Sequence, residues 1–192
     1  GKKPQGEGPS NAPKLSQNIL KSTQPDAPEI VNPSGYINTD KITIGELKGK
    51  KVVLLDFWTY SCINCQRTTP ILNAWYDKYS SQGLEIIGVH TPEFEFEKNI
   101  ENVRGAVTKE KIKYPVVLDN DYSTWNVFGK RYWPRQYLIN REGKIVANHI
   151  GEFSPTDREA FEKEIQKELN VQTAVTNPKY TSVDSSQTVS PE

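Results

Sequence analysis

Residues 51–65 read Lys51-Val-Val-Leu-Leu-Asp-Phe57-Trp58-Thr-Tyr-Ser-Cys62-Ile-Asn-Cys65, and the fold assignment depends on them. The run from Lys51 to Phe57 is almost continuously apolar, which is typical of a strand covered on both faces in a parallel sheet. Apolar residues then recur at helical spacing from about residue 62 to 81, and Gly83 follows where that helix should end. Both cysteines therefore stand where a buried strand passes into a helix.

Strand and helix patterns alternate through the rest of the chain. The closing helix starts with Ser154 as its N-cap and Pro155 at its first position. The order β-α-β-α-β-α-β-β-α predicts an α/β fold, with a mixed central sheet and helices on both faces. The segments behind this prediction are strands at 84–89, 114–118, 136–139 and 144–150, a helical face on Phe96, Ile100, Val103 and Val107, a short helix at 122–128, and a β-hairpin extension from residues 35–38 and 41–44.

Composition excludes several classes of protein. The 192 residues carry 24 Lys and Arg against 24 Asp and Glu, so no cationic surplus exists for a nucleic-acid clamp or a polybasic membrane patch. No apolar run reaches the ~20 residues needed to cross a bilayer. Two cysteines make neither a disulfide-rich scaffold nor, by themselves, a zinc site. The absence of Met leads us to expect a processed chain or an excised domain.

The uneven composition predicts the domain boundaries. Residues 1–28 and 170–192 contain few hydrophobic residues, too few to offset an ordering entropy of roughly 1–2 kcal/mol per residue. We expect a flexible linker or stalk at 1–28, one domain at 29–169, and a flexible tail at 170–192.

The spacing of Cys62 and Cys65 favours redox chemistry. Two intervening residues, wound into a first helical turn, bring the two sulfurs within bonding distance. Cys62 faces unpaired backbone N–H groups and the positive end of the helix dipole, which favour its thiolate and make it the attacking nucleophile. Cys65 lies one turn further in and acts second, as the resolving thiol.

Three other roles for the cysteine pair compete with this one. A structural disulfide closing so short a loop contributes only about 2 kcal/mol. A zinc site needs two more ligands, and only His90 and His149 are available, far apart in the sequence. Two unrelated buried cysteines would make their placement a coincidence. A CxxC motif close to a βαβ pattern favours the redox role.

Other polar residues allow more than one interpretation. An unpaired Asp56 inside an apolar strand costs several kcal/mol or stays protonated, so it either shuttles the proton of Cys65, pairs with a lysine, or is exposed. The acidic run Glu93, Glu95 and Glu97 is either a solvated helix start or part of a partner-binding rim. His149 is expected to be a half-buried, hydrogen-bonded histidine.

The chain resembles the TlpA/ResA-like group of thioredoxin-like proteins over roughly residues 27–153. The motifs are Asp56–Pro70, Gly88-Val-His-Thr-Pro-Glu-Phe-Glu-Phe96 and Arg131-Tyr-Trp-Pro134, and they look closest to the thioredoxin-like domain of DipZ-type proteins, which is fused to a CcdA-like membrane segment. The resemblance implies a thioredoxin fold. It also implies a cis-proline at Pro134. We assign Trp133, Trp58 and Tyr60, with Pro134, to a substrate groove, and the alternative for Trp133 is an aromatic residue of the core. The chain departs from thioredoxins at Gly88, where they carry a lysine near the buried acid.

The resemblance further implies the activity. We expect a monomeric thiol–disulfide oxidoreductase outside the cytoplasm, tethered to the membrane only through an anchor or fused domain, with cytochrome c biogenesis as an associated process. A CcdA/DsbD-like membrane protein would supply electrons, and disulfide-bonded exported proteins would be the substrates. No organic cofactor, metal or nucleic acid is expected. The alternatives are a thiol oxidase or isomerase of the same fold, and a non-catalytic module that binds partners.

Overall fold

A computed structural model describes residues 19–21, 23–129 and 132–171 of the chain. Seven strands form one sheet in the order β1-β7-β6-β3-β4-β5-β2. Their bounds are β1 Ile19–Lys21, β2 Gly35–Ile37, β3 Val52–Trp58, β4 Leu84–His90, β5 Val116–Leu118, β6 Arg135–Ile139 and β7 Ile145–Ile150. Strands β3, β4 and β5 run parallel and the other pairs are antiparallel, so the predicted mixed sheet is confirmed.

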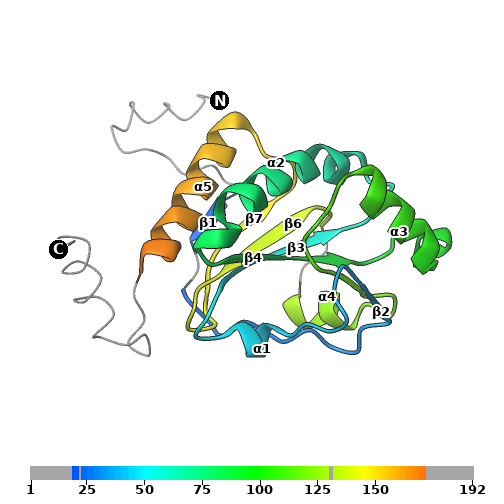
Figure 1. Ribbon diagram of the computed structural model, residues 1–192, viewed down its shortest axis with the longest axis horizontal. Coiled ribbons are helices and arrows are strands. Elements are labelled where there is room, and N and C mark those ends of the chain that lie inside the picture. The colour runs from blue at the N-terminus through cyan, green and yellow to red at the C-terminus, as the bar shows by residue number, and fades with distance from the viewer. Residues whose placement is uncertain (1–18, 22, 130–131, 172–192) are drawn as a thin grey trace, which may run out of the picture.

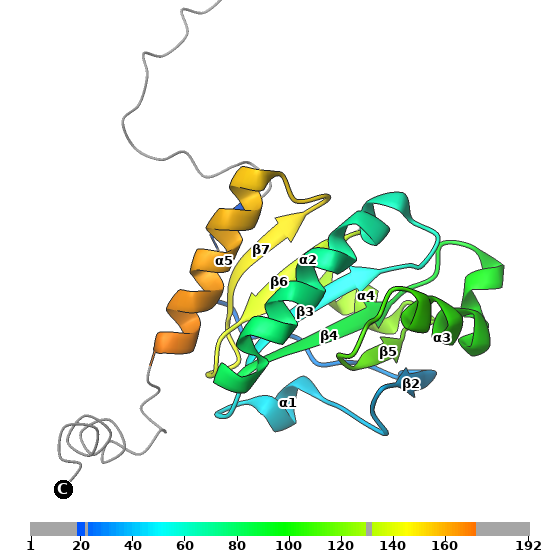
Figure 2. The ribbon, with the colours of Figure 1, turned by 45° about the horizontal axis from the view of Figure 1, so that its top comes forward.

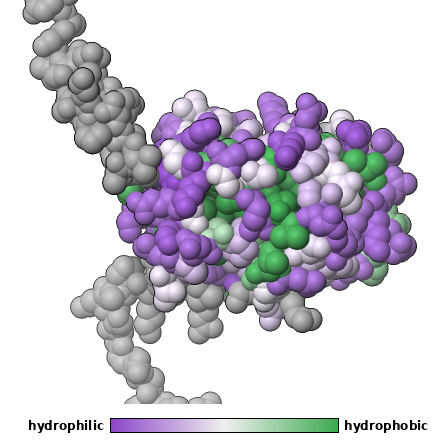
Figure 3. Space-filling view, turned by 90° about the horizontal axis from the view of Figure 1, so that it is seen from below, coloured by the Kyte–Doolittle hydropathy of each residue, from purple (hydrophilic) through white to green (hydrophobic). Residues whose placement is uncertain are grey.

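Helices cover both faces of the sheet (Figure 1). One face carries α2 (Ile63–Tyr79), α3 (Ile100–Lys109) and α5 (Pro155–Asn170), and the other carries α1 (Ile44–Leu47) and α4 (Ser123–Phe128). Every residue of β3 is buried, because the strand lies between these two layers. Figure 2 shows α2 above β3 and α5 beside β7. Seen from the α1 and α4 side, the surface is largely hydrophilic, with apolar residues gathered near the middle of the face (Figure 3).

Local signals set the ends of the elements much as the sequence predicts. Gly83 adopts φ +109, which favours glycine, and it follows the short 3₁₀ turn η1 (Ser80–Gln82) that ends α2. The Ser154 hydroxyl accepts a hydrogen bond from the Asp157 N–H at 3.1 Å and so caps α5. Gly143 has φ +81 in the turn that joins the antiparallel strands β6 and β7, the strands predicted at 136–139 and 144–150.

The prediction of an N-terminal hairpin is only partly correct. Residues 35–37 do form a strand, but β2 pairs with β5 instead of with residues 41–44. The second segment turns into α1 because Thr43 and Glu46 form a capping box, in which each side chain accepts a hydrogen bond from the other residue's backbone N–H. The β-branched residues Ile42, Thr43 and Ile44 favour a strand, but the capping box starts a helix here instead.

Part of the predicted linker belongs to the sheet. Strand β1 pairs with β7, and the N–H of Ala27 donates to the Gly143 carbonyl at 2.8 Å. A short strand needs few apolar residues of its own when it adds to an existing edge, and Ile19 is buried there, at 2 % exposure. Residues 1–18 and 172–192 lie outside the described part of the chain.

The helical face through Phe96 is interrupted. A 3₁₀ turn, η2 (Glu95–Lys98), precedes α3, and the Asn99 side chain caps α3 by accepting from the Glu101 N–H at 2.8 Å. Phe96 is consequently 55 % exposed, whereas Val103 and Val107 are buried as predicted. Within residues 19–21, 23–129 and 132–171, no helix has the length and apolar character required to cross a membrane.

Candidate functional site

The turn from β3 into α2 holds both cysteines at the start of the helix. Cys62 is the N-cap of α2, with extended backbone angles, and it is partly exposed. Cys65 lies in the first helical turn and is 2 % exposed. Both are free thiols, and the N–H of Cys65 donates to the sulfur of Cys62 with an N–S distance of 3.4 Å. Pro70 lies inside the same helix.

The two thiols have opposite acidities. The Cys65 thiol donates to the Cys62 sulfur, and the backbone N–H groups of Cys65 and Asn64 add to it, so the pKa of Cys62 falls to about 6 despite partial burial. Burial raises the pKa of Cys65 far above its ordinary value, and the neighbouring Cys62 and Asp56 raise it further. Cys62 is therefore ionised and accessible at neutral pH, while Cys65 stays protonated inside.

Asp56 is buried behind the cysteines, at 3 % exposure. Burial raises its pKa to about 8, while a 2.7 Å hydrogen bond from the Gln136 amide acts in the opposite direction. The charge of Asp56 acts on Cys65, and that of Cys62 acts on Asp56. A carboxyl that is neither exposed nor paired with a lysine, and whose pKa lies near neutrality, has the properties of a proton acceptor for Cys65.

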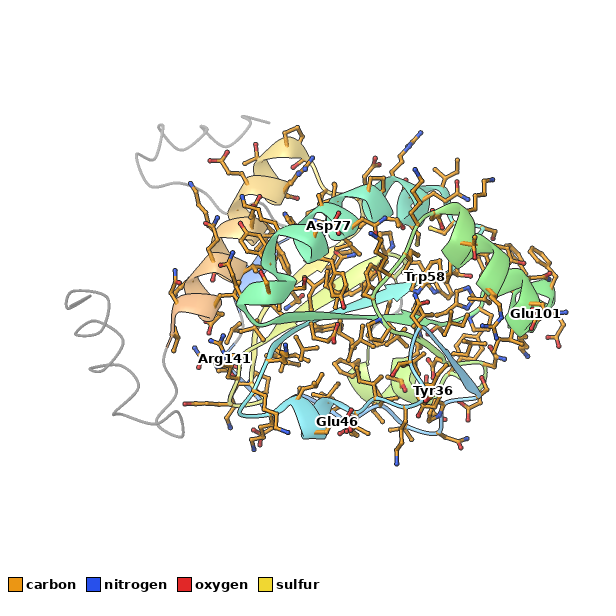
Figure 4. All side chains as sticks on the ribbon, viewed as in Figure 1. Tyr36, Glu46, Trp58, Asp77, Glu101 and Arg141 are labelled. Carbon is orange, nitrogen blue, oxygen red and sulfur yellow. The ribbon has the colours of Figure 1, made fainter. Side chains whose placement is uncertain are left out.

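Gly88 stands opposite Asp56 on β4, and its missing side chain makes room for Trp58. A Cβ at this position would lie 2.8 Å from Nε1 of Trp58 and 3.2 Å from Tyr114. Figure 4 labels Trp58 at the end of β3, and its side chain is only 2 % exposed. Trp58 therefore belongs to the core, and its assignment to a substrate groove is wrong because the glycine admits the indole beneath the surface.

The other predicted groove residues lie nearer the surface. Trp133 is partly exposed, donates from Nε1 to the Thr91 carbonyl at 2.9 Å, and contacts Trp125 with ring centroids 4.4 Å apart. It lines a hollow of about 520 Å³ with Tyr122 and Trp125. The Trp133–Pro134 peptide bond is cis. Tyr60 is partly exposed and stacks on His90, with ring centroids 5.7 Å apart.

Glu97 is the residue whose role sequence reasoning missed. It is fully buried, unlike the exposed Glu93 and Glu95, and it accepts hydrogen bonds from the hydroxyls of Thr59 and Ser61 and from backbone N–H groups. These bonds hold its pKa below the ordinary value although burial acts against them. The sequence does not reveal this role, because the three acids alternate in the same way and only the η2 turn directs Glu97, and not Glu93 or Glu95, into the interior.

His90 is a second buried polar group beside the cysteine turn. Its side chain is 0 % exposed, and its Nε2 accepts from the N–H of Tyr60 at 3.2 Å. Burial lowers its pKa to about 4, so the ring is neutral and able to accept that bond. His90 and Glu97 thus hold the three residues that lead into Cys62. Among the described residues, no group of three or more His, Cys, Asp or Glu side chains is arranged to hold a metal ion.

An accessible thiol of low pKa at a helix start, next to a buried thiol of high pKa, defines a thioredoxin-like thiol–disulfide oxidoreductase in this fold. The comparisons with known proteins agree with this class. The chain belongs to the Redoxin family, whose model matches residues 23–165.

Particular relatives refine this placement. The chain is 44 % identical over 147 residues to Protein DipZ of Mycobacterium tuberculosis, covering 75 % of this chain but 21 % of that protein. It is 33 % identical over 125 residues to the thiol-disulfide oxidoreductase ResA of Bacillus anthracis, covering 65 % of this chain and 69 % of ResA. The chain thus spans about a fifth of the length of the DipZ proteins.

A solved structure supports the same fold. The thioredoxin domain of a thiol-disulfide oxidoreductase from Bacteroides vulgatus superposes with a TM-score of 0.60 at 28 % identity, covering 75 % of this chain and 98 % of that domain. The predicted thioredoxin fold, resemblance and enzyme class are therefore confirmed.

Proposed function

We propose that this chain reduces disulfide bonds of exported proteins outside the cytoplasm. The observation that carries the proposal is the asymmetry of the cysteine pair: Cys62 is partly exposed with a pKa of about 6, while Cys65 is buried with a raised pKa. In such a pair the two sulfurs react in a fixed order, Cys62 first, because only Cys62 is both ionised and accessible.

The exchange has two steps. The Cys62 thiolate attacks one sulfur of the substrate disulfide, which forms a mixed disulfide and releases the other substrate sulfur as a thiolate. Cys65 then gives its proton to ionised Asp56, and its thiolate attacks the Cys62 sulfur. The second substrate sulfur leaves, and a Cys62–Cys65 disulfide remains. The substrate has gained two electrons, and the proton on Asp56 is available to the departing thiolate.

The substrate would lie in an extended form beside the cis-proline Pro134. Trp133, directly before Pro134, and Tyr60, two residues before Cys62, are both partly exposed, and we assign both to the substrate groove. The hollow that Trp133 lines with Trp125 supports a site for one bulky side chain of the substrate. A Trp133→Ala variant should raise the KM for a protein substrate more than it lowers kcat.

We propose that a membrane protein supplies the electrons. The 44 % identity to DipZ supports a CcdA/DsbD-like membrane partner that reduces the Cys62–Cys65 disulfide after each turnover, in a setting such as cytochrome c biogenesis. We propose that the domain, expected at residues 29–169 and extended by the strand at 19–21, is a monomer tethered to the cell envelope by an anchor or fused domain.

Trapping tests this function directly. A Cys65→Ser variant lacks the resolving thiol, so covalent Cys62 adducts with exported proteins should accumulate and should release on treatment with dithiothreitol. The wild-type protein should also reduce insulin. A folded Cys65→Ser variant whose Cys62 reacts with iodoacetamide, but which captures no protein, would argue against a substrate-facing Cys62.

The alternative functions predict different results. Relatives of this fold have reduction potentials from about −270 to −120 mV, and a value near the oxidising end would favour the thiol oxidase or isomerase role. A non-catalytic binding module would leave insulin oxidised with or without its cysteines. The relation to ResA-type oxidoreductases favours a catalytic role over the binding module.

A further inference from the structure

A row of buried polar side chains leads away from Asp56 across the sheet. Gln136 lies directly opposite Asp56 on β6, and His149 lies directly opposite Gln136 on β7. Asp157, in the first turn of α5, completes the row. All four side chains are at most 3 % exposed. Because the three strand residues are in register, their side chains share the face of the sheet covered by α2 and α5.

The row is continuously hydrogen-bonded. Gln136 donates from Nε2 to Oδ1 of Asp56 at 2.7 Å, and Oε1 of Gln136 lies 2.9 Å from Nδ1 of His149. The other ring nitrogen of His149 lies 3.1 Å from Oδ2 of Asp157. The ring itself stacks on Phe153 with centroids 3.9 Å apart and planes 5° apart. His149 is thus fully buried, which corrects the expectation of a half-buried histidine.

The polarity of an amide makes this row directional. A glutamine side chain has one donor end and one acceptor end, so Nε2 can point at Asp56 only while Oε1 points at His149. A proton on Nδ1 of His149 favours this orientation because Nδ1–H then donates to Oε1. If the amide turned over, its oxygen would face the Asp56 carboxyl and favour the protonated acid. The proton on His149 therefore selects which state of Asp56 the amide supports.

We propose that Gln136, His149 and Asp157 are positioning residues that hold the Gln136 amide donor on Asp56 and so keep Asp56 ready to take the proton of Cys65. The contact with Asp157 holds the imidazole in place, Nδ1–H of the imidazole orients the amide, and the amide stabilises the carboxylate. When Nε2 carries a proton as well, the ring is an imidazolium, the form that Asp157 favours. This inference rests on the proposed role of Asp56 in the second exchange step. A row with a purely structural role would not need to reach the carboxyl that acts on the cysteines. Apolar residues of similar volume would fill the same space with a smaller desolvation penalty.

Other charged groups around the row act on the same equilibrium. Cys62 and Cys65 on α2, Glu110 at the end of α3, and Tyr114 before β5 act electrostatically on or with Asp56. Around His149 these groups are Asp157 on α5 and Arg135 on β6. Burial lowers the pKa of His149, and Asp157 counteracts this. The negative neighbours of Asp56 disfavour its ionisation, which leaves the Gln136 amide as the contact that favours it.

Stopped-flow reaction with one equivalent of 5,5′-dithiobis(2-nitrobenzoate) separates the two steps. The first release of nitrothiobenzoate reports attack by Cys62, and the second reports displacement by Cys65. In the wild-type protein the second rate should rise with pH, with a midpoint near the Asp56 pKa of about 8. His149→Leu should move this midpoint upward with an unchanged plateau. Each pH unit by which the midpoint rises should slow the second step about tenfold at pH 7.

Matched variants separate positioning from structural support. His149→Gln retains a side-chain donor and should return the midpoint part of the way to its wild-type value. Glu159→Gln, at an exposed position of the helix that carries Asp157, should leave the profile unchanged. In an Asp56→Asn background, His149→Leu should have no further effect on the second step. A variant that lowers the plateau without moving the midpoint, or that still acts in the absence of Asp56, would overturn the inference.

The failures of the two proposals are distinguishable. If Asp56→Asn leaves the pH step of the second release in place, the role of Asp56 fails and this inference fails with it. If Asp56→Asn removes the step but Gln136→Leu and His149→Leu do not move it, only this inference fails. Should those variants not fold, NMR of the unaltered protein decides the question. The resonances of the His149 ring nitrogens should change at the pH where the Asp56 carboxyl titrates, and the lack of a common step would refute the coupling.

Discussion

The carboxylate of Glu97 accepts a 2.9 Å hydrogen bond from the hydroxyl of Ser61, the residue directly before the attacking cysteine. The same oxygen accepts from the hydroxyl of Thr59, and the other oxygen accepts from the N–H groups of Glu93 and Phe94. One buried acid therefore ties the η2 turn to the segment that leads into α2. The position of Cys62 depends on this contact as well as on its own helix.

Replacing Glu97 by glutamine should destabilise the protein. The amide NH₂ of Gln would face hydroxyl or N–H donors in place of one carboxylate oxygen, so the unfolding free energy should fall by about 2–3 kcal/mol in urea denaturation. Glu95→Gln is the matched control, because Glu95 is largely exposed, with 87 % of its side chain accessible. Equal stabilities of the two variants would show that the hydrogen bonds of Glu97 do not stabilise the fold.

Gly88→Ala should also destabilise the fold. The new Cβ would lie 2.8 Å from the Trp58 indole and 3.2 Å from Tyr114, and both neighbours are buried. Overpacking of this kind costs about 1–3 kcal/mol, which thermal unfolding would detect. Gly105→Ala, on α3, where the added carbon would have no neighbour within 4 Å beyond its own helix backbone, should be neutral or stabilising. The idea fails if Gly88→Ala is as stable as Gly105→Ala.

The thiolate of Cys62 should be measurable by alkylation. The rate with iodoacetamide should rise with pH to a plateau, with a midpoint near the pKa of about 6, because only the thiolate reacts. Cys65→Ala removes the largest stabilising hydrogen bond and should raise the midpoint by about 1 to 2 pH units. Cys65→Ser keeps a hydroxyl donor and should raise it less. An unchanged midpoint in Cys65→Ala would assign the acidity to the helix start alone.

Asp56 should make stability depend on pH. Its pKa is about 8 when folded, above the ordinary value of 3.8, so the folded state holds the extra proton between these values. The stabilising contribution is therefore complete below pH 4 and is lost as pH rises through 8. Asp56→Asn should remove this slope and, at pH 9, raise the unfolding free energy by up to about 5 kcal/mol relative to wild type. Parallel stability profiles for the two proteins would contradict the assignment.

Much of the fold follows from periodicity and end signals. The apolar run before Cys62, the glycine after α2, and the Ser154–Pro155 start of α5 each act locally, so their outcome is visible in sequence. The hairpin predicted from residues 35–38 and 41–44 does not form, because strand pairing is a long-range property. Residues 35–37 pair with β5, about 80 positions away, and a capping box decides the following segment.

The site was predictable where chemistry and spacing coincide. Cys62, Cys65 and the buried Asp56 follow from one strand and one helix start. Trp58 was misplaced because nothing in its own segment reveals that Gly88, on the adjacent strand, leaves space for an indole. Gln136 and His149 join Asp56 only through strand register, which a single sequence does not display.

The outermost strands of the sheet, β1 and β2, both come from the segment ahead of α1. A fragment beginning at Asn38 would lose both, and the backbone N–H and C=O groups of β5 and β7 would be left without their ladder partners. Each uncovered strand could then pair with the uncovered strand of another copy, and the fragment should aggregate through its two sheet edges. The solubility of such a fragment would therefore measure how far β1 and β2 protect the protein from aggregation.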